Sequence, residues 1–193
     1  MKMRNLVVLA SGSGSNAENI IRFFKLSKNV KVSYLLSNRP DAYALQRAKA
    51  LGVNTMVFNR DDFYNNGKVA NFLREEQPDL IVLAGFLWLV PQEIIKNFPN
   101  RIINIHPALL PKYGGKGMYG DKVHRAIIEN GERESGITIH FVNEKYDEGS
   151  TIFQARCTIS ADETASSLAE KIHNLEHEHF PRVIQQVLES LEQ

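Results

Sequence analysis

Short apolar runs alternate with amphipathic segments along the first 105 residues, and this alternation restricts the fold more than any other feature of the chain. The runs have the length of strands buried on both faces, and the segments between them carry apolar residues at helical spacing. Such alternation produces a parallel sheet covered by helices on both faces, so we predict an α/β, Rossmann-like fold. The expected strands are residues 6–10, 30–36, 55–58, 80–84 and 102–105, and the expected helices are residues 16–25, 41–52, 69–76 and 91–97.

The pattern changes in the last third of the chain. Residues 137–142 and 151–158 have the pattern of two strands joined by a loop around Asp147, which predicts antiparallel or mixed pairing. Residues 164–191 are expected to form one long helix that Pro181 kinks. Asp41 is expected to cap the second helix of the chain. Because no repeat, low-complexity tract or linker interrupts the sequence, we expect a single domain over residues 1–193.

Composition excludes several classes of function. Hydrophobic residues make up 43% and charged residues 23% of the 193, a balance typical of a globular domain with a real core. The formal net charge of +1 gives no overall field that favours nucleic acid or an anionic membrane. The single cysteine, Cys157, rules out an internal disulfide and fits a reducing compartment. No apolar stretch approaches a membrane span or a signal segment, so we expect a cytoplasmic protein.

Ligands of parallel sheets bind beyond the carboxyl ends of the strands, which here are residues 11–16, 85–90 and 106–111. The first of these segments, Ser-Gly-Ser-Gly-Ser-Asn, follows a buried strand and opens a helix; we call it the glycine turn. Its glycines let backbone amides approach a ligand closely, and the helix N-terminus attracts an anion such as phosphate.

Four interpretations of the glycine turn compete. Gly12, Gly14 and Ala17 match a dinucleotide fingerprint, but no carboxylate follows the second strand, which disfavours NAD. Arg39 follows the second strand instead, so NADP is not excluded as the ligand. A Walker A loop is excluded because Gly-Lys-Ser/Thr is absent. The two remaining interpretations are a site for one phosphate monoester on a small substrate and an ordinary tight turn with no ligand.

A second candidate site lies at the end of the fifth expected strand, in Asn104-Ile105-His106-Pro107. Strand alternation places Asn104 and His106 on the same side. An amide donor beside a group that titrates near neutrality can stabilise a developing oxyanion and move a proton. Asp147 could orient the imidazole or relay the proton. The alternatives are that His106 only caps the strand end and that Asp147 only forms a turn.

Two further patterns admit both a functional and a structural interpretation. Residues 173–177 match His-x-x-Glu-His, an inverted zinc-protease pattern, but no third ligand and no protease context accompany it, so we predict no metal. Trp88 and Phe86 stand among Leu87, Leu89 and Val90 at the end of a strand, where they form either core or the wall of an apolar pocket. Cys157 is interpreted as a buried strand residue and not as a nucleophile.

Together these segments resemble the phosphoribosylglycinamide formyltransferase family of purine biosynthesis over nearly the whole chain. The landmarks occur in the family's order, and the ordered set is far more specific than any one of them: residues 11–16, 83–87, 104–112, 136–142, 147–149, 176–177 and Pro181. The resemblance implies a formyltransferase fold and an enzyme that transfers the formyl group of 10-formyltetrahydrofolate to the amine of N1-(5-phospho-D-ribosyl)glycinamide. Direct attack through a tetrahedral intermediate would need no metal.

The resemblance also implies roles for individual residues. The substrate phosphate would lie on Gly14, Ser15 and Asn16, and Glu176 would bind the ribose. Asn104, His106 and Asp147 would be catalytic, with residues 1–100 as a phosphate-binding half and residues 101–193 as a catalytic and folate-binding half. Only small-molecule substrates are implied as partners, for a monomer or homodimer. Folate would contact the loop 143–147 and the residues Leu87, Trp88, Leu89, Val90, Asn104 and, through its tail, Lys68.

The chain departs from the family pattern in two places: residues 114–121 are longer than expected, and residues 61–68 are short. Two relatives share the Asn-x-His and Asp set, but methionyl-tRNA formyltransferase normally adds a C-terminal domain and formyltetrahydrofolate deformylase an N-terminal one. Neither addition is expected here. A nucleotide-binding regulatory module and an NADP-dependent reductase remain as alternatives of other classes.

Overall fold

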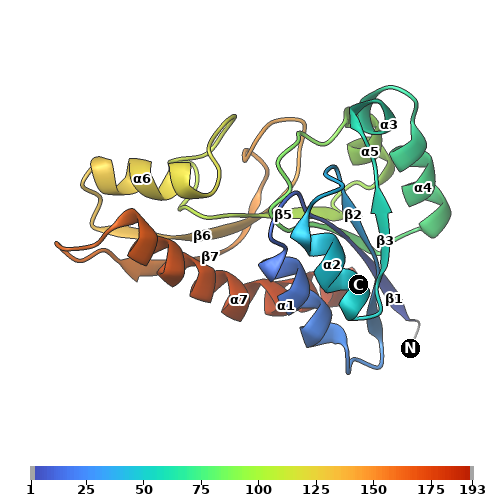
Figure 1. Ribbon diagram of the computed structural model, residues 1–193, viewed down its shortest axis with the longest axis horizontal. Helices are drawn as coiled ribbons and strands as arrows, with labels where there is room; N and C mark the ends of the chain where they lie inside the picture. Colours follow the sequence, from blue (N-terminus) through green and yellow to red (C-terminus); the bar gives the residue numbers. More distant parts are fainter. Residues whose placement is uncertain (1–2, 192–193) are drawn as a thin grey trace.

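The computed structural model describes residues 3–191, which form one seven-stranded sheet flanked by helices (Figure 1). The first four pairings in sheet order are parallel and the last two are antiparallel, as the two sequence patterns predicted. In sheet order the strands are β3 (Asn54–Val57), β2 (Val30–Ser37), β1 (Arg4–Leu9), β4 (Leu80–Leu83), β5 (Ile102–His106), β6 (Glu134–Phe141) and β7 (Thr151–Thr158).

Helices cover both faces of the sheet and create two hydrophobic cores. On β1, Leu6 and Val8 pack into one core while Val7 and Leu9 pack into the other, because successive strand residues point to opposite faces. The first core includes residues of α1 (Ser15–Phe24), α2 (Tyr43–Ala50), α6 (Asp121–Glu129) and α7 (Ala165–Ser190). The second includes residues of α3 (Arg60–Tyr64), α4 (Lys68–Glu76) and α5 (Gln92–Asn97).

One expectation about local structure was wrong, and one short helix was not expected. Asp41 does not cap α2, whose N-cap is Ala42 without a side-chain hydrogen bond. Instead the Asp41 carboxylate pairs with Arg39 at 2.7 Å. The helix α3 was not expected, although a capping box in which Asn59 and Asp62 each bind the other's backbone amide explains its start.

The long C-terminal helix has the predicted extent and continues through Pro181 from Ala165 to Ser190. A capping box of Thr164 and Ser167 starts it. Along its length α7 contacts α1, α6, β6 and β7, so it joins the parallel and antiparallel parts of the sheet (Figure 1). Between residues 3 and 191, no helix is long and apolar enough to cross a membrane.

Candidate active site

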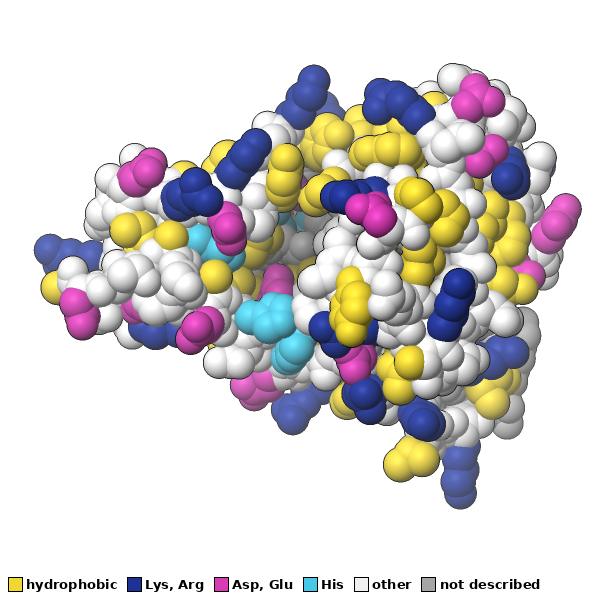
Figure 2. Space-filling view, viewed as in Figure 1, with side chains coloured by type: hydrophobic (Ala, Val, Ile, Leu, Met, Phe, Trp, Pro, Cys, Tyr) yellow, Lys and Arg dark blue, Asp and Glu magenta, His cyan; other side chains and the backbone are white. Residues whose placement is uncertain are grey.

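A cavity of about 860 Å³ lies beyond the carboxyl ends of β1, β4 and β5. The three segments that the strand-end rule singled out meet there, since the lining includes residues 12–16, 83–90 and 104–107. Residues of the loop 115–120, of the β6–β7 connection and of α7 complete the wall. Figure 2 shows the hollow near the middle of the molecule, with histidine side chains beside it. Its volume suits a small-molecule ligand.

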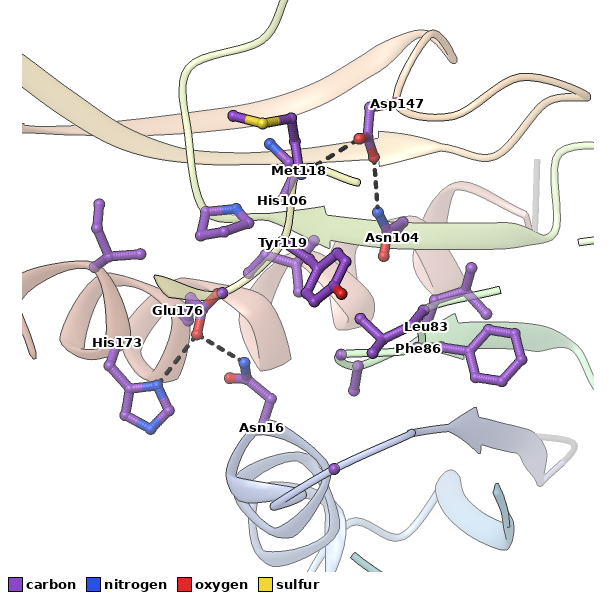
Figure 3. A pocket seen from close by; sticks show the side chains of 18 of the residues that line it. Asn16, Leu83, Phe86, Asn104, His106, Met118, Tyr119, Asp147, His173 and Glu176 are labelled. Atoms are coloured by element: carbon purple, nitrogen blue, oxygen red, sulfur yellow. Dashed lines mark hydrogen bonds and ion pairs between the residues drawn. The ribbon is translucent and has the colours of Figure 1, made fainter. Parts of the chain in front are cut away.

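Asn104 and His106 both face the carboxylate of Asp147 (Figure 3). The Asn104 amide Nδ2 donates to Oδ1 at 3.4 Å, and His106 Nδ1 lies 3.5 Å from Oδ2. The backbone amide of Gly115 also donates to Oδ2, at 2.9 Å. Asp147 itself has a left-handed backbone, with φ of 57°, which a residue with a short polar side chain tolerates. Three groups from β5 and the loop after it therefore converge on the carboxylate of Asp147, whose side chain comes from the β6–β7 connection and is 10% exposed.

The imidazole of His106 is 3% exposed and held from two sides. Its Nε2 lies 2.8 Å from the carbonyl oxygen of Tyr113, which accepts a hydrogen bond when Nε2 carries the proton. Burial lowers the pKa of His106 below its ordinary value, and this outweighs the opposing effects of the Asp147 charge and the Tyr113 carbonyl. The ring is then neutral near pH 7 and presents an unprotonated Nδ1 towards Asp147.

Asp147 is kept ionised by its neighbours. Burial acts to raise the pKa of this carboxyl group, but its contacts with His140, His106 and the Gly115 amide together bring the pKa below the ordinary value. A carboxylate with this environment can fix the orientation of an imidazole and stabilise its protonated form.

His140 belongs to the same cluster, although no role was predicted for it. It is the direct cross-strand partner of Asn104 in the β5–β6 register. Its Nε2 lies 3.2 Å from Asn104 Nδ2 and 3.6 Å from Asp147 Oδ1. Its Nδ1 lies 2.8 Å from the Phe141 carbonyl and donates to it, so Nε2 accepts from the Asn104 amide in the neutral ring and donates to Asp147 when the ring is protonated. The antiparallel pairing expected for residues 137–142 was the signal that could have found it.

The glycine turn closes the other end of the cavity. Gly14 has φ of 74° and lies so close to α2 that an added Cβ would come within 2.4 Å of the Ala44 side chain, so only glycine fits. Asn16 donates from Nδ2 to Glu176 at 2.8 Å, which ties α1 to α7 (Figure 3). Its Oδ1 is buried and has no hydrogen-bond partner among residues 3–191. Such an orphaned acceptor beside a cavity fits a polar ligand.

Ser11 joins the glycine turn to the neighbouring strand ends. The hydroxyl is 1% exposed, donates to Asn38 Oδ1 at 2.7 Å and accepts from the Leu87 amide at 3.1 Å. One buried side chain therefore fixes the turn after β1 against the segments that follow β2 and β4.

The His-x-x-Glu-His motif forms an ionic network. Glu176 Oε2 lies 3.2 Å from His173 Nδ1, and the His173 and His177 rings have centroids 4.2 Å apart. The hydrogen bond to Glu176 raises the pKa of His173. No group of three potential metal ligands occurs within the part of the chain that the structure describes.

An apolar wall follows β4. Trp88 packs against the rings of Phe58, Phe63 and Phe86, and it lines the cavity together with Leu87, Leu89 and Val90. The Tyr64 hydroxyl donates to the Leu89 carbonyl at 2.8 Å and so holds this segment.

Of the predicted folate loop 143–147, only residues 145–147 line the cavity. Lys68 also lies outside the cavity lining. It starts α4, and its Nζ lies 3.4 Å from the Asp62 carboxylate. The unexpected length at residues 114–121 has a place in the site, because Met118 and Tyr119 line the cavity.

Two features define the class of this protein. One is a Rossmann-like sheet with an antiparallel edge, and the other is a glycine turn that faces an Asn–His–Asp cluster across one cavity. The model of the family described as formyl transferase matches residues 4–184, and the chain belongs to that family. The phosphoribosylglycinamide formyltransferases of Escherichia coli (strain K12) and Arabidopsis thaliana are similar to it at 35% and 39% identity. The expected resemblance is thereby confirmed.

The extent of these similarities differs between the relatives. The E. coli alignment covers 93% of this chain and 85% of the relative. The Arabidopsis relative, whose name adds "chloroplastic", is matched over 97% of this chain but only 66% of its own length. The crystal structure of glycinamide ribonucleotide transformylase 1 from Symbiobacterium toebii superposes with a TM-score of 0.88 at 34% identity, over 97% of this chain and 89% of that one. This likeness confirms the predicted formyltransferase fold.

Proposed function

We propose that this protein transfers the formyl group of 10-formyltetrahydrofolate to the amine of N1-(5-phospho-D-ribosyl)glycinamide, a step of purine biosynthesis. The observation that carries the proposal is the convergence of Asn104 and His106 on Asp147, between a glycine turn and an apolar wall. An NADP reductase has no need for this cluster. The names of the relatives favour the same reaction.

The phosphorylated substrate would lie at the glycine-turn end. The amides of Gly14, Ser15 and Asn16 stand where the N-terminus of α1 attracts an anion. Glu176, held by Asn16 and His173, would accept hydrogen bonds from the ribose hydroxyls. The amine would then point along the cavity towards Asp147.

The folate would occupy the opposite end. Leu87, Trp88, Leu89 and Val90 offer an apolar surface for a flat ring, and Asn104 and residues 145–147 of the loop 143–147 offer polar groups beside it. These features fit 10-formyltetrahydrofolate, which supplies an activated formyl group when bound. The contact of Lys68 with the folate tail stays a prediction, because Lys68 lies outside the cavity lining.

The chemistry follows from the cluster. Asn104 Nδ2 would stabilise the negative oxygen that develops as the amine attacks the formyl carbon, and the His106 ring would do so once its Nδ1 carries a proton. His106 Nδ1 would accept the amine proton, with the Asp147 carboxylate stabilising the charged ring, and could return the proton to the leaving nitrogen. Orientation and electrostatics account for the rate in this scheme.

We further propose that the chain works as a single domain in the cytoplasm, as a monomer or homodimer. The two halves, residues 1–100 and 101–193, both contribute to one cavity, which supports treating them as one functional unit. Its partners are then small-molecule substrates alone.

The deciding experiment mixes the purified protein with both substrates and follows the absorbance of the deformylated folate. Formation of one equivalent of N-formyl product per folate released is the expected result. Folate release that does not depend on the amine would indicate a deformylase and would overturn the proposal, as would the absence of turnover.

A further inference from the structure

Arg47 of α2 approaches the glycine turn from outside the cavity. We infer that it is a positioning residue that holds the turn in its phosphate-binding conformation, an inference that rests on the proposed function. It does not line the cavity, so any effect on a substrate must pass through the turn itself.

The contacts of Arg47 reach three different parts of the structure. Its Nε donates to the carbonyl oxygen of Ser13 at 3.0 Å. Its Nη1 pairs with the carboxylate of Glu18, one turn into α1. Its guanidinium also lies over the ring of Tyr43, 4.8 Å from the centroid. The planar fork therefore joins the turn, the first turn of α1 and the start of α2 at once.

The Ser13 contact determines where the next amide points. In a planar trans peptide the carbonyl and the following N–H point in opposite directions, so fixing the Ser13 oxygen towards α2 directs the Gly14 N–H away from α2. The peptide between Gly12 and Ser13 is held in the same orientation, because the Ala44 amide donates to the Gly12 carbonyl at 3.1 Å. Both Ser13 and Gly14 line the cavity, so their two amides are available to a ligand there.

The turn needs such a restraint because two of its residues are glycines. Glycine moves readily between backbone conformations, and rotation of the peptide between Ser13 and Gly14 would turn a carbonyl oxygen towards the bound anion. That oxygen would repel phosphate where an amide would attract it. Arg47 opposes this rotation directly by its hydrogen bond to the oxygen.

The chain offers a matched control in Arg22. This residue pairs with the same Glu18 carboxylate, at 2.7 Å, but from within α1. Arg22→Gln removes a positive charge and a Glu18 contact, as Arg47→Gln does, while leaving the hydrogen bond to Ser13 in place. The difference between the two variants therefore reports the contacts that only Arg47 makes, the hydrogen bond to Ser13 and the ring contact with Tyr43.

The test compares steady-state kinetics of the wild type, Arg47→Gln, Arg47→Lys and Arg22→Gln. Arg47→Gln should raise KM for the phosphorylated amine about tenfold, with kcat and the folate KM changed less than about twofold. Arg47→Lys should fail to restore this KM, since an ammonium group lacks the planar fork. Arg22→Gln should match the wild type. Equal effects of Arg47→Gln and Arg22→Gln, or full restoration by lysine, would overturn the inference.

Competition by inorganic phosphate separates this inference from the proposed function. Phosphate should displace a fluorescent phosphate-ester probe from the wild type, and about tenfold more should be needed for Arg47→Gln. This measurement requires no turnover, so it still tests Arg47 if the protein transfers no formyl group. Equal phosphate affinity in the two proteins would refute the positioning role. A parallel loss of affinity for a folate analogue would refute it too, because a general loss of structure would then explain the result.

Discussion

At the scale of single residues, the chemistry of the site depends on how several groups share the carboxylate of Asp147. Its two oxygens contact Asn104, His106, His140 and the Gly115 amide, so any change there alters the orientation of several groups. Strand alternation was sufficient to predict that Asn104 and His106 lie on the same side of β5, where both face Asp147. The part played by Asp147 could not follow from local pattern, because a loop carboxylate is placed by tertiary structure.

Replacing Asp147 by Asn tests the charge while nearly keeping the shape. We expect kcat to fall by about two orders of magnitude, since the neutral amide no longer stabilises a charged His106 ring. The control is Glu148→Gln, because this neighbouring carboxylate is exposed and pairs with Lys145 at 3.0 Å. Comparable losses in the two variants would show that the loop and not the Asp147 charge is responsible. Steady-state kinetics at saturating substrates supply the measurement.

The pH dependence should report His106. Burial lowers its pKa from the ordinary value of 6.5, so the ring stays neutral to a lower pH than a free histidine. A fall in pH protonates the ring and removes the proton acceptor, so kcat/KM should decline on the acid side with an apparent pKa below 6.5. Asp147 should add no acid limb in this range, because its own pKa lies below the ordinary value. An acid limb centred above 6.5 would contradict this assignment.

At the scale of elements, the antiparallel edge depends on two close approaches of backbone. A Cβ on Gly136 would come within 1.9 Å of the Ala155 carbonyl oxygen, and one on Gly149 within 1.6 Å of the Phe141 oxygen. The spacing of apolar residues predicted most strands and helices but carried no information about these contacts. It also failed for α3, a five-residue helix too short to show a period, and for Asp41, whose carboxylate binds Arg39 in place of a helix amide.

Gly136→Ala should therefore destabilise the β6–β7 pair. We expect the free energy of unfolding to fall by about 1–3 kcal/mol, as for other overpacked positions. Gly12→Ala is the control, since an added Cβ there would meet nothing within 4 Å and the backbone does not require glycine. Chemical denaturation monitored by circular dichroism gives both values. An unchanged midpoint for Gly136→Ala would mean that the two strands separate without loss of stability.

At the scale of the whole molecule, the cavity is built from segments that span residues 12 to 176. The strand-end rule predicted three of them because they follow parallel strands. The contributions of α7 and of residues 115–120 depend on how the C-terminal third folds back over the sheet, which periodicity does not encode. A ligand in this cavity contacts both halves of the chain and should stabilise the whole.

The phosphorylated amine alone should therefore raise the melting temperature. At a concentration 100 times its Kd, a ligand that binds only the folded state adds about 2.7 kcal/mol, which corresponds to roughly 5–10 °C for a chain of this size. The same compound without its phosphate is the control and should give a much smaller shift at equal concentration. Differential scanning calorimetry provides the comparison. Equal shifts in melting temperature would show that the phosphate contributes nothing to the binding free energy.

The buried hydroxyl of Ser11 has a consequence for how this protein can change in evolution. It binds Asn38 and the Leu87 amide together, so the end of the cavity with the glycine turn and the end with the apolar wall share one anchor. Substitutions that remodel one end will displace the other through that anchor, and their effects will be epistatic. A new specificity at either end would then arise by paired changes, and libraries that vary residues 11–16 and 85–90 jointly would reach variants that separate libraries miss.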